Sequence, residues 1–151
     1  MIELALDELI AHQPPMRLLD RVLSVDADGA VAELTVRRDN PLFVPGRGLP
    51  AYTGLELMAQ TIALIDGWRC QHDGIPPKIG FLLGCRRYAT ECTAFDDGMT
   101  LVIAVKMVLA GGDMYSFEAT ICDAAGRVLA TANLNVYAPK NPDAFLKGGT
   151  V

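Results

Sequence analysis

Hydrophobic and polar residues recur along this chain with periods that predict its secondary structure. Residues 2–11 combine acidic side chains with leucine and alanine at helical spacing, which predicts a short amphipathic helix that Pro14 ends. Residues 50–68 are almost wholly apolar and predict a longer helix of about 20 residues that runs to Gln71. We expect this helix to be buried nearly all round, because it is apolar nearly all round.

Further segments are rich in valine, leucine and threonine, which is typical of β-strands. They are residues 17–25, 30–36, 78–90, 99–109, 113–122 and 127–137. A turn composition at 26–29 predicts a hairpin between the first two, and short Gly/Asp clusters predict consecutive antiparallel pairing of the last four. Residues 37–49 have no periodicity and predict a loop.

The order of these elements predicts an α+β fold. An antiparallel sheet that is apolar on one face must cover that face, and the helix that begins near residue 50 is the long element available for it. We therefore expect an antiparallel sheet wrapped around one long central helix. The length of 151 residues predicts a single domain, 1–151, with its core at about 10–137 and a loose tail from residue 139.

Composition and charge exclude several classes of function. The net charge is −5, and there is no dense run of Lys and Arg, which argues against nucleic-acid binding. The cysteines form no C-x-x-C pair and only two histidines accompany them, so we expect reduced thiols and no metal site. The amino terminus is acidic where a signal peptide needs positive charge, and the apolar window 55–65 is too short to span a bilayer. We therefore expect a cytoplasmic protein that does not act on membranes.

Glu56 is the charged residue that the long apolar helix does not explain. Thr53 and Glu56 have the spacing of a capping box, in which the glutamate reaches back to the backbone N–H at the helix start. Alternatively, the carboxylate lies in an apolar pocket and transfers protons. Gln60 lies one turn later on the same face and is expected to hydrogen-bond it.

The two histidines and the arginines are weaker candidates. His12 is either a capping or surface residue or a general acid–base, whereas His72 lies at the helix end, where a cation suits the helix dipole. Asp20 and Arg21 are expected to anchor the first strand. The arginines, including the pair Arg86–Arg87, are either a solvated surface or a basic patch for an acidic carrier protein or a phosphate. The other arginines of this set are Arg37, Arg38, Arg47 and Arg69.

Three stretches together carry a resemblance. Residues 12–22 read HQPPMRLLDRV, residues 56–60 read ELMAQ, and residues 79–84 read IGFLLG, followed by Arg86 and Arg87. The chain resembles the hotdog-fold β-hydroxyacyl-(acyl carrier protein) dehydratases of fatty-acid synthesis. Its first stretch is similar to their opening PH-x-x-P…L-x-DRV signature, the second to the E-A-M-A-Q of their central helix, and the third to the strand after that helix. The likeness covers about residues 10–137.

One feature of that family is missing from the chain. The family's loop histidine lies before the central helix in a G-H-F-P context, but residues 40–50 read NPLFVPGRGLP and contain no histidine. Ala51 also replaces the usual glycine after the proline. The loop histidine therefore cannot be carried over. Residues 49–61, LPAYTGLELMAQT, are similar to a divergent branch that is associated with aryl-polyene-type and related polyketide or fatty-acid clusters.

The resemblance implies a 3-hydroxyacyl-ACP dehydratase that needs no cofactor. It would act on thioesters of an acyl carrier protein or coenzyme A, as a homodimer or higher homo-oligomer. We expect Glu56 to transfer protons at the substrate hydroxyl, with His12 as the second acid–base group. Backbone N–H groups near Ala51 and Tyr52 would hold the thioester oxygen, and Gln60 would help to bind substrate. Arg86 and Arg87 would contact the carrier.

Two other functions fit the same residues. A non-catalytic acyl-binding or partner subunit would explain why the loop histidine is absent. An acyl thioesterase would use a carboxylate near the central helix to activate water.

Overall fold

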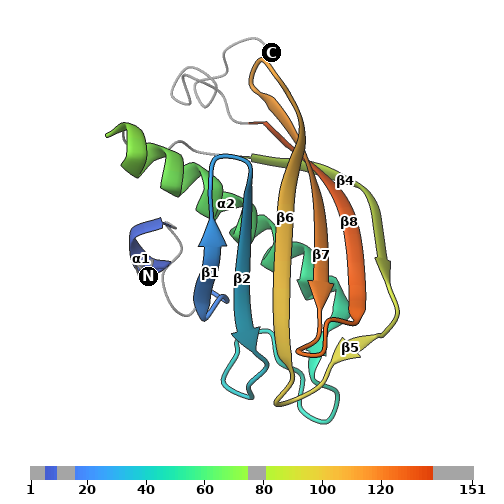
Figure 1. Cartoon of the computed structure of the whole chain (residues 1–151). Coiled ribbons are helices and arrows are strands. Elements are labelled where there is room, and N and C mark those ends of the chain that lie inside the picture. Colours follow the sequence, from blue (N-terminus) through green and yellow to red (C-terminus); the bar gives the residue numbers. More distant parts are fainter. Residues whose placement is uncertain (1–5, 10–15, 75–80, 138–151) are drawn as a thin grey trace, which may run out of the picture.

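A large antiparallel sheet curves around one long helix, α2 (Gly54–Asp73), in the computed structural model, which describes residues 6–9, 16–74 and 81–137 (Figure 1). The strands of the sheet, in spatial order, are β1 (Arg21–Val25), β2 (Gly29–Thr35), β6 (Thr100–Gly111), β7 (Met114–Cys122), β8 (Val128–Tyr137) and β4 (Phe81–Thr90). The predicted α+β architecture, with a sheet wrapped around a central helix, is confirmed.

Short elements complete the described chain. The helix α1 (Leu6–Leu9) lies inside the helix predicted for residues 2–11, and a 3-10 turn, η1 (Ala51–Thr53), leads into α2. The two-residue strands β3 (Leu49–Pro50) and β5 (Ala94–Phe95) pair with each other. The loop predicted for residues 37–49 therefore ends in a strand that docks the start of the helical segment.

The predicted consecutive pairing of the last four strands is correct for β6–β7 and β7–β8 and wrong for β4. β4 pairs with β8 at one edge of the sheet, and β6 pairs with β2. Residues 91–99 lead from β4, at the edge beside β8, to β6, beside β2, instead of forming a hairpin turn. The N–H of Gly98 donates to the carbonyl of Val36 (2.8 Å), and the N–H of Val36 donates to the carbonyl of Met99 (2.8 Å). These bonds bring β6 into the sheet beside β2.

The core lies between α2 and the inner face of the sheet. Alternate residues of β2 and β6 are buried there, as the period of a strand requires. Every residue of 54–70 is buried or half-buried, which confirms that α2 is enclosed on nearly all sides. Fully buried leucines and isoleucines such as Leu57, Leu64 and Ile103 each contribute about 1.5–3 kcal/mol to this packing. Among the described residues, no helix has the length and apolar character that would let it cross a membrane.

Candidate functional site

Glu56 lies more than one turn inside a continuous helical segment. Pro50 has extended dihedral angles, whereas Thr53 already has helical ones (φ −65°, ψ −17°), so η1 and α2 follow each other without a break. An N-cap residue needs non-helical dihedral angles to receive the helix N–H groups on its side chain. Thr53 makes no such cap, and its hydroxyl donates to the carbonyl of Pro50 (2.7 Å). The Thr53 half of the predicted capping box is therefore wrong.

A fully buried amide, that of Gln60, holds the Glu56 carboxylate. Its Nε2 donates to Glu56 Oε1 (2.9 Å) and to the carbonyl of Met16 (2.8 Å), and its Oε1 accepts the N–H of Leu18 (2.9 Å). Because Leu18 donates to Oε1, the amide nitrogen must face Glu56, which fixes the orientation of the amide. The predicted Glu56–Gln60 hydrogen bond is confirmed. A direct contact between Gln60 and substrate stays a prediction, and the structure shows an amide that orients the carboxylate.

The start of the helical segment is attached to β4 and to the chain that follows it. The N–H of Ala51 donates to the carbonyl of Thr93 (2.9 Å), and the carbonyl of Ala51 accepts the hydroxyl of Tyr88. The role predicted for the Ala51 N–H, to hold a thioester oxygen, does not fit this arrangement, because that N–H already has an acceptor. Tyr52 is 68% exposed beside this point, and its contact with substrate stays a prediction.

Tyr88 is a residue of this region that sequence reasoning missed. Its ring comes so close to α2 that a Cβ added to Gly54 would lie 2.2 Å from the Tyr88 hydroxyl oxygen. The absence of a side chain at Gly54 therefore leaves room for this approach. Burial raises the pKa of Tyr88 from 10.0 to about 12, so the hydroxyl stays protonated and keeps donating at neutral pH. A tyrosine within a strand carries no local sequence signal for such a contact.

Of the two histidines, His72 lies in the part of the chain that the structure describes, and His12 does not. His12 lies outside the described residues, so its acid–base role stays a prediction. His72 lies in the last turn of α2, where its exposed ring stacks on Trp68 with centroids 5.1 Å apart. The structural role predicted for His72 fits this position.

Most of the candidate arginines are paired on the surface. Asp20 accepts the N–H of Thr35 (2.7 Å) and pairs with Arg37, and Arg21 pairs with Glu33, so both act as the strand anchors that were predicted. Exposed pairs of this kind contribute about 0–1 kcal/mol each. Further pairs in the described part of the chain are Arg38–Asp97, Arg69–Asp28 and Arg127–Glu91.

Arg86 and Arg87 are both exposed, and neither makes an ion pair within the part of the chain that the structure describes. Neighbouring residues of a regular strand point to opposite faces, so one of them would otherwise face α2. The pairing of β4 with β8 shifts between Cys85 and Arg87, which marks a β-bulge at this point. The bulge keeps both guanidinium groups in solvent on the edge strand.

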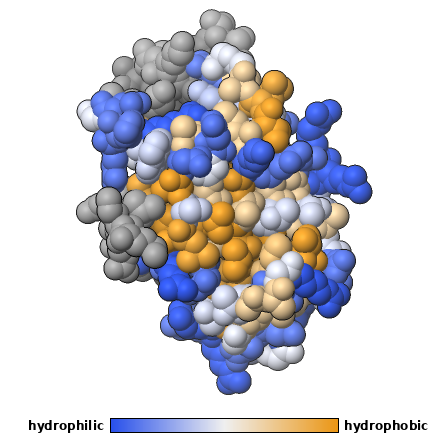
Figure 2. Space-filling view, in the orientation of Figure 1, coloured by the Kyte–Doolittle hydropathy of each residue, from blue (hydrophilic) through white to orange (hydrophobic). Residues whose placement is uncertain are grey.

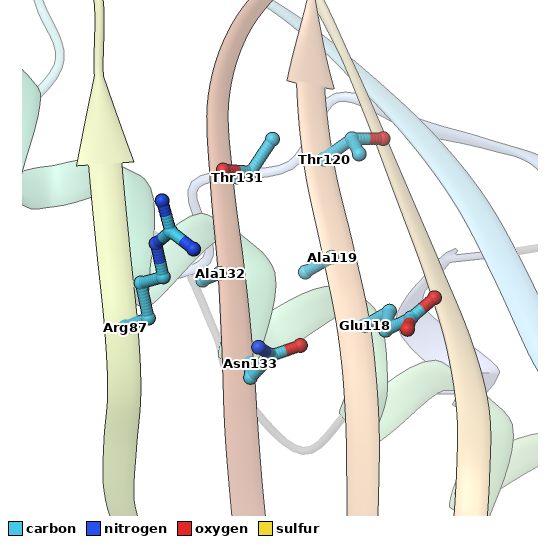
Figure 3. A pocket seen from close by; sticks show the side chains of 7 residues that line it. All are labelled: Arg87, Glu118, Ala119, Thr120, Thr131, Ala132 and Asn133. Carbon is cyan, nitrogen blue, oxygen red and sulfur yellow. The ribbon is translucent and has the colours of Figure 1, made fainter.

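Arg87 also lines a hollow on the outer face of the sheet, on the side away from α2 (Figure 3). The hollow has a volume of about 330 Å³ and is lined by Arg87, Glu118, Ala119, Thr120, Thr131, Ala132 and Asn133. Figure 2 shows the same outer face, where apolar side chains gather over the middle of the sheet. The hollow and the Glu56 network therefore lie on opposite sides of the sheet.

The described residues contain no group of three or more His, Cys, Asp or Glu side chains that could hold a metal ion. No disulfide joins the described cysteines, which are Cys70, Cys85, Cys92 and Cys122. The reactive group in the described part of the site is the Glu56 carboxylate, which lies at the start of a buried helix and accepts a hydrogen bond from the Gln60 amide.

Comparison with known proteins gives a family and a fold. A model of ApeP-like proteins, described as ApeP dehydratase, matches residues 4–147. A chain in the structure of the dehydratase heterocomplex ApeI:P from Xenorhabdus doucetiae is 31% identical, with a TM-score of 0.86 over 97% of this chain and 99% of that chain. No curated protein matches the chain.

More distant structures share the fold alone. The PaaI protein of Escherichia coli, from the phenylacetic acid degradation operon, is 16% identical with a TM-score of 0.61, over 77% of this chain and 80% of that one. A hypothetical thioesterase from Streptococcus pneumoniae, solved with coenzyme A, is 14% identical with a TM-score of 0.63, over 78% and 84%. Together with the observed topology, these matches confirm the predicted hotdog fold.

Proposed function

Because this chain belongs to the ApeP-like dehydratase family, we propose that it dehydrates β-hydroxyacyl thioesters on an acyl carrier protein, in synthesis of the aryl-polyene, polyketide or fatty-acid type. The observation that carries the proposal is the Glu56 carboxylate, which the buried amide of Gln60 holds at the start of the central helix. A carboxylate with a fixed orientation suits proton transfer at a defined atom of a substrate.

The reaction breaks two bonds of the substrate. A base removes the α-proton, the β-hydroxyl leaves with a second proton as water, and a double bond forms between the α- and β-carbons. Glu56 is assigned to protonate the departing hydroxyl, or to move both protons in turn. Donors near Tyr52 would stabilise the thioester oxygen as it gains negative charge.

If Glu56 moves only one of the two protons, the second acid–base group lies outside residues 40–50, which contain no histidine. We propose that a partner subunit supplies it, so that Glu56 of this chain and a histidine of the partner act on one substrate. The ApeI:P structure is a heterocomplex, which supports this assembly over the homodimer predicted from the sequence. Within this chain, His12 is the other candidate.

The exposed pair Arg86–Arg87 is proposed as the contact for the acidic carrier. Two guanidinium groups without ion-pair partners among the described residues are available to carboxylates or to a phosphate. Replacing both by alanine is expected to raise KM for the carrier-bound substrate about tenfold at low salt, because a rim charge mainly affects encounter. Arg38→Ala combined with Arg127→Ala is the matched control, since it removes two exposed arginines that have partners. An equal rise of KM in the control pair would contradict a specific carrier site.

Reconstitution tests the proposed function. The full chain, a histidine-bearing hotdog partner and the mixed complex are each given a β-hydroxyacyl-carrier substrate, and loss of water from the acyl group is followed by mass spectrometry. We expect dehydration by the complex at a rate at least about tenfold above either protein alone. Equal activity of the partner alone would assign this chain to the non-catalytic subunits, and release of free thiol would assign it to the thioesterases. The proposal also places the protein in the cytoplasm.

A further inference from the structure

We propose that Tyr88 is a positioning residue, which fixes the first turn of α2 and thereby the place of the Glu56 carboxylate. This inference rests on the proposed function, because it takes Glu56 as the reacting group. Tyr88 lies on β4, far from Glu56 in sequence, and neither the resemblance nor the local pattern assigns it a role. The geometry that supports it consists of a hydrogen bond, a close packing contact and a second attachment of the helix through Gln60.

The hydrogen bond joins the Tyr88 hydroxyl to the carbonyl of Ala51, the first residue of η1. The N–H of the same residue donates to Thr93. Both backbone polar groups of Ala51 are therefore attached to β4 and the segment after it. Just before Ala51, β3 pairs with β5, which extends the same attachment by two residues.

The packing contact is between the Tyr88 ring and Gly54, which is buried at the first position of α2. A Cβ at residue 54 would meet the Tyr88 hydroxyl oxygen at 2.2 Å and Ile121 Cδ1 at 3.0 Å. The ring thus lies directly on the helix start, two residues before Glu56. A shift of the ring would move this turn, because close-packed interiors transmit small displacements.

A second attachment holds the helix from another direction. Gln60 connects α2 to the backbone of Met16 and Leu18, and its amide also contacts Glu56. With this attachment alone, the first turn of the helix could still pivot about Gln60. Tyr88 holds the residues before Glu56 and Gln60 holds those after it, so the carboxylate is fixed between two points.

Tyr88 is distinguished from an acid–base catalyst by what it contacts. Its proton is already donated to a main-chain carbonyl, and the raised pKa keeps that proton in place at neutral pH. The structure gives it no hydrogen bond to the Glu56 carboxylate. Its effect on the reaction therefore passes through the position of the helix.

The test uses Tyr88→Phe in the reconstituted complex, because this change removes the hydroxyl and keeps the ring. We expect kcat to fall about tenfold with KM within about twofold, since a small misplacement of a reacting group slows the chemical step more than it weakens binding. The shape of the pH–rate profile should not change. Amide hydrogen exchange of residues 51–56 should become faster. Gly54→Ala, which pushes the ring away, should give a larger loss of kcat than Tyr88→Phe.

Tyr115→Phe is the matched control, because Tyr115 is a half-buried strand tyrosine of β7 without a hydrogen bond from its hydroxyl in the described region. It should leave kcat and amide hydrogen exchange at residues 51–56 unchanged.

An unchanged kcat in Tyr88→Phe would overturn the proposal. The loss of one limb of the pH–rate profile would also overturn it, because it would make Tyr88 an acid–base group. A rise in KM alone would also overturn it. If even the wild-type complex does not dehydrate the substrate, the proposed function fails, and unchanged exchange at 51–56 would separately show that Tyr88 does not anchor the helix.

Discussion

The two ends of α2 are built differently, although they belong to one helix. At its start, Gly54 and Gln60 are buried, and contacts from β4 and from residues 16–18 hold the first two turns. At its end, residues 71–74 are exposed, and the helix stops at Gly74, whose left-handed backbone (φ 68°) lets its N–H reach the carbonyl of Cys70. The polar network of Gln60 and the Glu56 carboxylate that it binds lie at the same end as these contacts. Among the described residues, side-chain hydrogen bonds tie α2 to other segments at Gln60 and at Arg69, and those of Gln60 lie beside Glu56.

Other parts of the chain come very close to α2 at two of its glycines, and a different segment approaches at each. Gly54 admits the ring of Tyr88, which holds the site. Gly67 admits the backbone of α1, since a Cβ there would lie 1.8 Å from the carbonyl oxygen of Leu9. The first contact concerns the position of Glu56, whereas the second attaches the amino-terminal helix to the far half of α2.

Among substitutions that leave Glu56 itself in place, Gln60→Leu is expected to have the largest effect, because it acts at the start of α2. It leaves the N–H of Leu18 and the carbonyl of Met16 without their partner, at a cost of about 1–3 kcal/mol for each buried group. It also removes the hydrogen bond that Gln60 donates to the Glu56 carboxylate, so we expect kcat to fall by about 10²-fold in the complex. Chemical denaturation and steady-state kinetics measure the two losses.

Thr61→Val is the matched control for Gln60→Leu. Thr61 is as fully buried as Gln60 on the next position of the helix, but its hydroxyl donates within the helix, to the carbonyl of Leu57 (2.7 Å). We expect a stability change of about 1 kcal/mol and an unchanged kcat. A loss of kcat as large as that of Gln60→Leu would mean that any buried polar change in α2 disturbs the site.

Gly67→Ala is expected to destabilise the fold without affecting the chemistry of Glu56. The added methyl group must displace α1 from α2, which costs about 1–3 kcal/mol. The free energy of unfolding should therefore fall, whereas kcat should stay within about threefold of wild type. A much larger loss of kcat would indicate that the segment after α1, where His12 lies, takes part in the reaction.

His72→Ala is expected to have the smallest effect. The substitution removes an exposed ring that stacks on Trp68, which contributes about 0.5–1.5 kcal/mol at most. Thermal unfolding should shift slightly, and kcat and KM should match those of wild type. A clear loss of activity would contradict the distinction between the two ends of α2.

The elements of the fold could be predicted because their signals are local. The apolar run of α2 and the alternating strands follow from periodicity, and the Glu56–Gln60 bond follows from their spacing of one helical turn. The capping box failed because η1 extends the helical segment toward Pro50, so that Thr53 is no longer its first residue. The loop that precedes the helix gave no local signal for this extension.

The remaining features depend on contacts between distant residues. The crossing of residues 91–99 and the attachment of Ala51 to Thr93 and Tyr88 exist only once β4 lies at the edge beside β8. No spacing within the sequence encodes that position. The same holds for the bulge that exposes Arg86 and Arg87 together, because it is defined by the partner strand.

The most direct test of the account is Glu56→Gln in the reconstituted complex. The amide has nearly the shape of the carboxylate, and its oxygen can still accept the hydrogen bond of Gln60, so the fold should be retained. We predict a stability within about 1 kcal/mol of wild type and a single-turnover dehydration rate lower by roughly 10²–10⁴-fold. Wild-type turnover in this variant, measured on folded protein, would contradict the assignment of Glu56 as the proton-transferring group.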